Sequence, residues 1–161
     1  MVEPYRVTFV CTGNICRSPL AEQVFRHHVE QEGLDVEVDS SGTGSWHVGD
    51  GADRRTVRVL REHGYRTAHA ARQFRPGWFD RYDLIIALDE GHVDALRVMA
   101  PSREARAKIR LLREFDPDAG DDLDVPDPYY GRAADFEHVL ELVEAAMPGL
   151  LAEVRQALKE R

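Results

Sequence analysis

The stretch "VTFVCTGNICRSPLAE", Val7 to Glu22, holds both cysteines of the chain in one short loop. An apolar, β-branched run precedes this loop and predicts a buried strand over Tyr5–Cys11. Ser18 as the N-cap and Pro19 at the first helical position predict a helix directly after the loop. The loop is therefore a tight strand-to-helix turn, and the rest of the chain must show whether it also carries chemistry.

Strands and helices are predicted to alternate along the remaining sequence. The pattern predicts strands at residues 34–42, 82–89 and 107–112 and helices at residues 18–33, 52–65, 91–99 and 135–158, the last kinked or broken at Pro148-Gly149. Such alternation is typical of a mostly parallel sheet. We therefore expect an α/β fold in one domain, residues 1–161. A four-stranded parallel sheet would carry helices on both faces.

Composition and charge exclude several classes of partner. The formal net charge of −8 argues against a nucleic-acid surface or an anionic membrane as the main partner. No apolar run approaches the roughly 18 residues that a membrane span requires. Residues 1–10 lack the basic start and long apolar stretch of a signal peptide. We therefore expect a cytoplasmic protein, with secretion by another route left open.

The loop from Cys11 to Ser18 has the features of an anion-binding site. Parallel sheets bind ligands beyond the carboxyl ends of their strands, and a helix N-terminus offers unpaired N–H groups and partial positive charge. Gly13 and Asn14 tolerate the positive φ of an anion-binding turn. Arg17 adds a planar fork for two phosphate oxygens. The sequence therefore predicts a phosphate site at this loop.

Cys11 lies at the bottom of this predicted positive cup. Cysteines at helix N-termini or beside cations have pKa values of roughly 3.5–7.5, because the field that holds an anion also stabilises a thiolate. A thiolate that faces the phosphorus of a bound monoester is a nucleophile. Ser18 can donate a hydrogen bond to Cys11 and ease its later departure. A buried structural cysteine in a simple turn is the alternative.

The pattern Cys-x5-Arg-Ser after the first strand resembles the low-molecular-weight protein tyrosine phosphatases. Several unrelated phosphatase folds share this pattern, but "VCTGNICRSPLAE" as a whole is more specific. The segments "DSSGTGSWHVG", "HAARQF", "YDLIIALD" and "DVPDPYYG" also resemble family segments, in the family's order. The resemblance implies a four-stranded parallel sheet and hydrolysis of phosphotyrosine in proteins or peptides, with no metal or other cofactor. Inorganic phosphate and similar oxyanions would be products or inhibitors.

A general acid for the leaving group is expected in "VPDPYY". Pro128 restricts Asp127 to an extended backbone, but Asp116 also precedes a proline, so this pattern alone does not decide between them. Tyr129 and Tyr130 favour Asp127, because aromatic rings beside the acid could line a pocket for a phenyl ring. The resemblance implies that Asp127 first protonates the leaving tyrosine and then activates water. Cys11, Arg17 and Asp127 are therefore the expected catalytic residues.

The resemblance also assigns binding and supporting residues. It implies that Trp46 and His47 form the wall opposite the tyrosines, although a tryptophan in such a loop equally packs onto the core. Ile15 would border the ring of a bound tyrosine. Relatives that act on phosphoarginine have threonine there, so Ile15 favours phosphotyrosine. The expected substrate-binding residues are Thr12, Gly13, Asn14, Ile15, Cys16, Ser18, Trp46, His47, Tyr129 and Tyr130, and the expected supports of the loop are Asn14, Ser18, Ser40 and His69.

The second cysteine, Cys16, suggests redox sensitivity. Oxidation of Cys11 to a sulfenic acid could be captured as a Cys11–Cys16 disulfide that thiols reverse. The alternative is a small residue that fills the back of the loop. Tyr129 or Tyr130 could also be phosphorylated by a tyrosine kinase, which would then be a partner; the sequence does not decide this.

Three other functions compete with phosphotyrosine hydrolysis. Arsenate reduction requires cysteines outside the loop, and the chain has only two cysteines. A phosphotyrosine-binding module without turnover would have lost the nucleophile, the arginine or the acid. A metal-dependent hydrolase would need clustered ligands, whereas His27 and His28 point about 100° apart on a helix. Activity that survives a chelator would separate this last function from the cysteine reaction.

Overall fold

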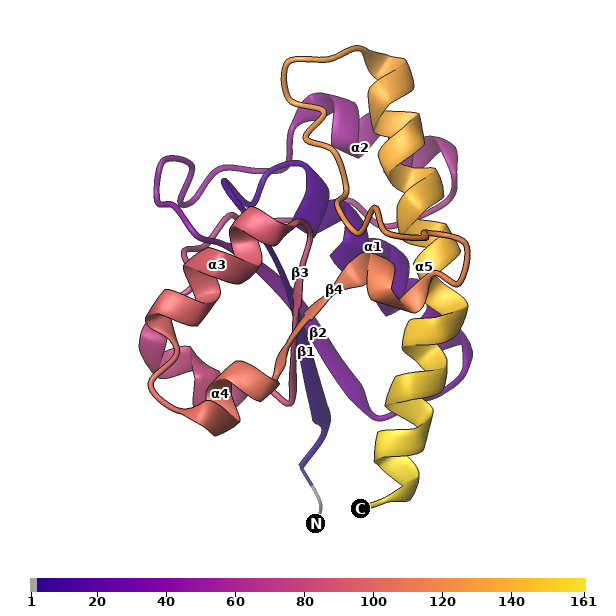
Figure 1. Ribbon diagram of the computed structural model, residues 1–161. Coiled ribbons are helices and arrows are strands. Elements are labelled where there is room, and N and C mark those ends of the chain that lie inside the picture. Colours follow the sequence, from indigo (N-terminus) through magenta and orange to yellow (C-terminus); the bar gives the residue numbers. More distant parts are fainter. Residues whose placement is uncertain (1–2) are drawn as a thin grey trace.

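The computed structural model describes residues 3–161, and it confirms the predicted α/β fold (Figure 1). The four strands are β1 (Tyr5–Cys11), β2 (Val36–Gly42), β3 (Leu84–Ala87) and β4 (Ile109–Leu111). All neighbouring strands run parallel, in the order β2-β1-β3-β4. The helices are α1 (Arg17–Gln31), α2 (Arg54–Glu62), α3 (Glu90–Met99), α4 (Arg103–Ala107) and α5 (Ala133–Lys159), with 3₁₀ turns η1 (Pro76–Arg81) and η2 (Leu112–Phe115).

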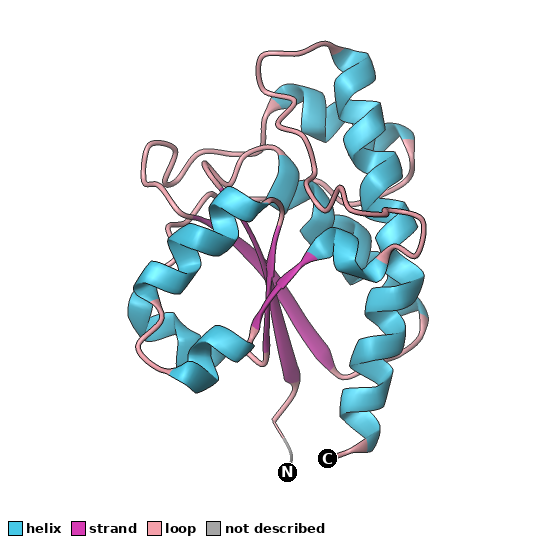
Figure 2. Ribbon diagram, viewed as in Figure 1, coloured by secondary structure: helices cyan, strands magenta, loops and turns pink. Residues whose placement is uncertain are grey.

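Helices cover both faces of the sheet (Figure 2). Alternate side chains of β1 point to opposite faces, as the period of a strand requires. Val7 and Phe9 pack with α1, α2 and α5, whereas Val10 packs with η1, α3 and α4. Because all four strands run in the same direction, the loops that follow β1, β2 and β3 gather at one end of the sheet (Figure 2). Within residues 3–161, no helix is long and apolar enough to cross a membrane.

Helix α1 begins earlier than the sequence predicts. Its first helical residue is Arg17 and its N-cap is Cys16, rather than Ser18. The reason is that the Ser18 hydroxyl contacts the Cys11 sulfur instead of capping the helix. The C-terminal prediction is confirmed, since Gly33 has a φ of 64° and follows the last turn.

The segment before β4 and the last helix also differ from the prediction. Residues 103–107 form α4, because Ser102 caps it by accepting a hydrogen bond from the Ala105 N–H at 3.1 Å, so β4 is shorter than expected. Helix α5 is not broken at Pro148. Pro148 lies on the exposed face, where the lost helical hydrogen bond faces solvent, while buried neighbours hold the helix in place. Gly149 allows α5 to lie directly against the backbone of Phe115.

Candidate active site

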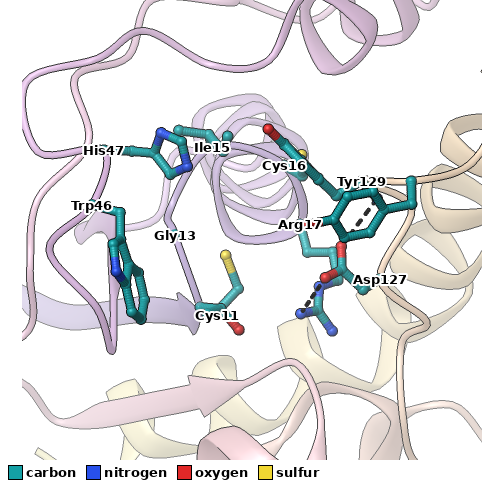
Figure 3. A pocket seen from close by; sticks show the side chains of 11 residues that line it. Cys11, Gly13, Ile15, Cys16, Arg17, Trp46, His47, Asp127 and Tyr129 are labelled. Atoms are coloured by element: carbon teal, nitrogen blue, oxygen red, sulfur yellow. Dashed lines mark hydrogen bonds and ion pairs between the residues drawn. The ribbon is translucent and has the colours of Figure 1, made fainter.

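A cavity of about 370 Å³ opens at the carboxyl end of β1 (Figure 3). Its size lies within the usual range of ligand pockets, and its position is the one that parallel sheets use for ligands. Its lining comes from three segments that are distant in sequence: the loop after β1, the loop after β2 and the loop before α5. The lining residues are Cys11, Thr12, Gly13, Ile15, Cys16, Arg17, Trp46, His47, Asp127, Tyr129 and Tyr130.

The loop after β1 leaves a run of backbone N–H groups available. Within the part of the chain that the structure describes, no backbone carbonyl or side chain accepts a hydrogen bond from the N–H groups of residues 12–17. The carbonyl groups of the same loop are paired instead, because Thr43 N–H donates to Cys11 and Gly44 N–H donates to Thr12. Carbonyls turned outward and N–H groups left free are the arrangement of an anion-binding nest at a helix N-terminus.

Asn14 anchors this loop from below. It is fully buried, and its φ of 58° is the only positive φ of a non-glycine residue in the described chain. Its side-chain amide donates to the hydroxyls of Ser18 at 2.8 Å and Ser40 at 2.9 Å, and its side-chain oxygen accepts from the Arg72 N–H at 2.9 Å. His69 Nε2 donates to the Asn14 carbonyl at 2.6 Å. The residues expected to support the loop therefore meet at one point.

Of the two residues that tolerate a positive φ in this loop, Gly13 and Asn14, only Asn14 adopts one. At Gly13 a Cβ atom would lie 3.0 Å from the His47 ring, a tight contact that would require the ring to shift. Gly42 has a similar role beneath the loop, where a Cβ atom would lie 2.6 Å from the Thr12 carbonyl oxygen. These glycines let the loop after β2 approach the loop after β1 closely.

The two cysteines have different surroundings. Cys11 Sγ lies 2.9 Å from the Ser18 hydroxyl and points into the cavity (Figure 3). When Cys11 is a thiolate it can only accept, so Ser18 then donates the hydrogen bond. Cys16 is also a free, buried thiol. Burial raises the pKa of Cys16 to about 12, with a further increase from the nearby Asp53 carboxylate and from Cys11. Cys16 is therefore a thiol at neutral pH.

Arg17 joins the loop after β1 to two other segments. Its side chain is buried, and its Nη1 donates to Asp89 Oδ2 at 2.8 Å and to the Val125 carbonyl at 2.9 Å. Asp89 begins α3 by accepting a hydrogen bond from the His92 N–H. Burial raises the pKa of Asp89, but the hydrogen bonds from Arg17 and from the His92 N–H, together with the Arg17 charge, outweigh it, so its net pKa is lowered. Asp89 is therefore a carboxylate that fixes the Arg17 guanidinium.

Asp127 faces Arg17 from the loop before α5. Its Oδ2 lies 3.8 Å from Arg17 Nη2, and its Oδ1 accepts from the Tyr129 N–H at 3.1 Å (Figure 3). Val125 fixes this loop two residues earlier, since its N–H donates to the Leu88 carbonyl at the end of β3. The Asp127 side chain is about half exposed, at 53%. The carboxyl group therefore lies between solvent and the loop after β1.

Aromatic side chains form two walls on opposite sides of Cys11 (Figure 3). Tyr129 lies on the side of Asp127, and Trp46 lies across the cavity from it. Trp46 is 75% exposed and covers Gly44, so it does not fold back onto the core. Tyr130 is 95% exposed beyond Tyr129. Asp116, the other aspartate that precedes a proline, does not line this cavity and accepts a turn hydrogen bond from Asp118 N–H.

Comparison with known proteins identifies the family. A sequence profile described as "Low molecular weight phosphotyrosine protein phosphatase" matches residues 6–160. The chain belongs to this family. It is 62% identical over 160 residues to a low molecular weight protein-tyrosine-phosphatase of Streptomyces coelicolor, covering 98% of each chain. It is 50% identical over 153 residues to low molecular weight protein-tyrosine phosphatase A of Mycobacterium tuberculosis, covering 93% of this chain and 91% of that protein.

The solved structures give the same assignment. A protein tyrosine phosphatase from Entamoeba histolytica with Hepes in the active site has a TM-score of 0.90 and 32% identity, covering 95% of this chain and 98% of that chain. The protein is thus a protein-tyrosine-phosphatase with the four-stranded fold of its family. The sequence had predicted both the family and the fold.

Sequence reasoning missed several polar residues around the phosphatase loop. Asp89 and His92 contact Arg17, while the buried Glu22 accepts a hydrogen bond from the Ser40 hydroxyl. The guanidinium carbon of Arg55 lies 5.7 Å from the centre of the Tyr129 ring. Arg55 also forms an ion pair with Asp53, the N-cap residue of α2. The only available signal was position, since Asp89 and His92 follow β3 at the ligand-binding end of the sheet.

Proposed function

We propose that this phosphatase hydrolyses phosphotyrosine monoesters through a cysteinyl-phosphate intermediate. In this proposal Cys11 is the nucleophile, Arg17 holds the phosphate, and Asp127 is the general acid and then the general base. The observation that carries the proposal is their convergence: the Cys11 sulfur, the free N–H groups of residues 12–17, Arg17 and Asp127 surround one cavity. We also propose that residues 1–161 act as a single domain.

The first step transfers the phosphoryl group to sulfur. The Cys11 thiolate attacks phosphorus while the bond between phosphorus and the phenolic oxygen breaks. Asp127 gives its proton to that oxygen, so the leaving group departs as neutral tyrosine. Arg17 and the loop N–H groups bind the equatorial oxygens, whose charge they stabilise in the transition state.

The second step returns the enzyme to its starting state. Asp127, now a carboxylate, removes a proton from a water molecule, and the water oxygen attacks phosphorus. The bond between phosphorus and sulfur breaks, which releases inorganic phosphate and the Cys11 thiolate. The Ser18 hydroxyl, 2.9 Å from the sulfur, stabilises this departing thiolate by donating a hydrogen bond. Phosphate and similar oxyanions are therefore expected to inhibit by occupying the same loop.

The walls of the cavity favour an aromatic phosphoester. Trp46 and Tyr129 lie on opposite sides of Cys11, and Ile15 lies on the rim of the loop (Figure 3). A flat phenyl ring between these side chains buries apolar surface on both faces, whereas the side chain of phosphoserine is too short to reach them. Phosphotyrosine in proteins or peptides is therefore the substrate we propose. The exposed Tyr130 is accessible to a tyrosine kinase partner.

The test is phosphate release from matched peptides that carry phosphotyrosine, phosphoserine or phosphoarginine, measured in the presence of a chelator. Wild-type enzyme should release phosphate from the phosphotyrosine peptide, and Cys11→Ser should abolish this release while keeping peptide binding. Release that survives in Cys11→Ser would refute the mechanism. Wild type that binds phosphotyrosine tightly without releasing phosphate would indicate a binding module, and preferred release from phosphoarginine would refute the substrate.

We also propose that Cys16 protects Cys11 from irreversible oxidation. Peroxide oxidises the Cys11 thiolate to a sulfenic acid, and the Cys16 sulfur then displaces hydroxide, which leaves as water with the Cys16 proton. A disulfide results, and an added dithiol reduces it. Both cysteines line the same cavity and neither is in a disulfide, which supports this proposal. The high pKa of Cys16 keeps it from competing with Cys11 as a nucleophile.

A further inference from the structure

His92 contacts the catalytic loop, but neither proposed step of the reaction uses it. It lies in the first turn of α3 and is 4% exposed. Its Nε2 atom is 2.9 Å from the Thr12 hydroxyl and 3.4 Å from Arg17 Nη2. Thr12 directly follows the nucleophile, and Arg17 is the phosphate-binding residue. One buried imidazole therefore touches both ends of the phosphate loop.

The hydrogen-bond chemistry determines the tautomer of this ring. The Arg17 guanidinium can only donate, so Nε2 of His92 must accept. Nε2 has a single lone pair, which the Thr12 hydroxyl and the Arg17 N–H share as donors, and the ring proton then lies on Nδ1. Nδ1 has no hydrogen-bond partner among residues 3–161 and lies 3.2 Å from Asp89 Oδ1, an electrostatic contact that favours this proton. Burial, together with the Arg17 charge, lowers the pKa of His92 to about 4, so the ring is neutral at neutral pH.

The contacts of Arg17 show what His92 contributes. A guanidinium has five N–H donors. The two on Nη1 are directed to Asp89 and to the Val125 carbonyl, and one on Nη2 is directed to His92. The Nε N–H and one N–H of Nη2 have no such partner among residues 3–161, and the Nε and Nη2 atoms lie along one edge of the plane. Such an edge binds two oxygens of a phosphate at once.

Building on the proposed function, we propose that His92 is a positioning residue of this active site. By accepting hydrogen bonds from Arg17 and Thr12, it fixes the rotation of the guanidinium plane so that one edge faces the phosphate. Asp89 and the Val125 carbonyl hold only Nη1 of Arg17, whereas His92 is the hydrogen-bond partner of Nη2 among residues 3–161. His92 neither touches the substrate nor transfers a proton in this role.

The test compares His92→Leu, which removes the acceptor at similar volume, with His92→Gln, whose amide oxygen can still accept. Because hydrogen bonds to charged groups are among the stronger ones, we expect His92→Leu to lower kcat roughly tenfold with little change in KM. Orthovanadate binding, measured by calorimetry, should weaken by a similar factor. His92→Gln should recover most of both. A purely structural role would lower the melting temperature in both variants and leave the kcat of the folded fraction unchanged.

Thr12→Val provides a second, independent variant, because it breaks the same contact from an exposed position of the loop. We expect a loss of roughly threefold in kcat, and the double variant with His92→Leu should lose less than the product of the two single losses. The proposal would be overturned by full activity of His92→Leu, by equal impairment of His92→Gln and His92→Leu, or by independent effects in the double variant. If His92→Leu does not fold, the other two variants decide. An active His92→Gln with an impaired Thr12→Val supports the proposal, and an impaired His92→Gln with a fully active Thr12→Val overturns it.

Vanadate binding keeps this inference separate from the proposed function. A wild-type enzyme that binds orthovanadate but does not hydrolyse phosphotyrosine peptides would refute the proposed reaction. The positioning role would still stand if His92→Leu weakened the vanadate affinity and His92→Gln restored it. Conversely, normal hydrolysis with unchanged vanadate affinity in His92→Leu would refute the positioning role alone.

Discussion

Replacement of Asn14 tests the idea that a strained, hydrogen-bonded residue holds the loop after β1 in its observed conformation. Asn14 has a φ of 58° and is fully buried, and its side chain makes three hydrogen bonds. Asn14→Ala removes all three bonds and places an alanine in the left-handed region. Asn14→Gly removes the same bonds but relieves the strain, so the two variants separate the two contributions.

The expected losses follow from these contacts. Each lost hydrogen bond costs roughly 0.5–1.5 kcal/mol, so three bonds amount to about 3 kcal/mol in either variant. An alanine in the left-handed conformation adds roughly 1–2 kcal/mol, whereas glycine adopts it freely but makes the unfolded chain more flexible by about 0.5–1 kcal/mol. The free energy of unfolding should therefore fall in both, and Asn14→Ala should be less stable than Asn14→Gly by up to about 1 kcal/mol.

Urea unfolding gives the two free energies, and phosphotyrosine hydrolysis gives the effect on the loop. Both variants should lose at least tenfold in kcat/KM, because Ser18 and the loop N–H groups lose their common anchor. Ser102→Ala, which removes the cap of α4 far from the site, is the matched control: it should lower stability by about 1 kcal/mol and leave kcat/KM unchanged. Variants of Asn14 that unfold like wild type, or that keep full activity, would refute the reasoning.

Three further predictions concern the acid, the buried histidine and the second cysteine. Asp127→Asn should lower kcat for phosphotyrosine by roughly 10²–10⁴-fold. The loss of kcat should be smaller for p-nitrophenyl phosphate, because its leaving group needs little protonation. Equal losses with the two substrates would contradict the general-acid role. Because the folded pKa of His92 is about 4, below its ordinary 6.5, the unfolded chain binds the extra proton as the pH falls. The unfolding free energy of wild type should therefore fall by roughly 3 kcal/mol more than that of His92→Gln between about pH 7.5 and pH 4, and parallel curves would contradict the buried neutral ring. After peroxide treatment, a dithiol should restore wild type more completely than Cys16→Ser, and equal recovery would contradict protection by Cys16.

The sequence predicted the phosphate loop because the loop is local. Cys11, Arg17 and the intervening residues belong to one strand-to-helix turn, so their spacing alone determines that they share one site. The order of strands and helices was predictable for the same reason, since hydrophobic periodicity is a short-range signal. Helix α4 escaped prediction because five residues do not establish a period, and its only signal was the capping Ser102.

The polar contacts around the loop could not be predicted, because they depend on how distant segments meet. His92 carries no motif, and its contact with Thr12 joins residues 80 positions apart. Glu22 lies on α1 among residues with a helical period, where a charged side chain normally indicates the exposed face. It is buried because Ser40 and Arg26 satisfy its carboxylate. Tertiary hydrogen bonding thus overrides the local pattern.

The placement of Asp127 shows how the loop after β1 and the segments distant from it in sequence depend on each other. Asp127 follows Val125, whose N–H binds Leu88 at the end of β3 and whose carbonyl accepts from Arg17. The proposed acid is therefore positioned through the same arginine that we propose holds the phosphate. A change that rotates Arg17 should move the proton donor as well as the phosphate, so phosphate binding and proton transfer should be lost together. Asp89→Asn, which keeps the shape but weakens the bond to Arg17, should accordingly impair both oxyanion affinity and the leaving-group step, whereas a change at Asp127 itself should impair only the second.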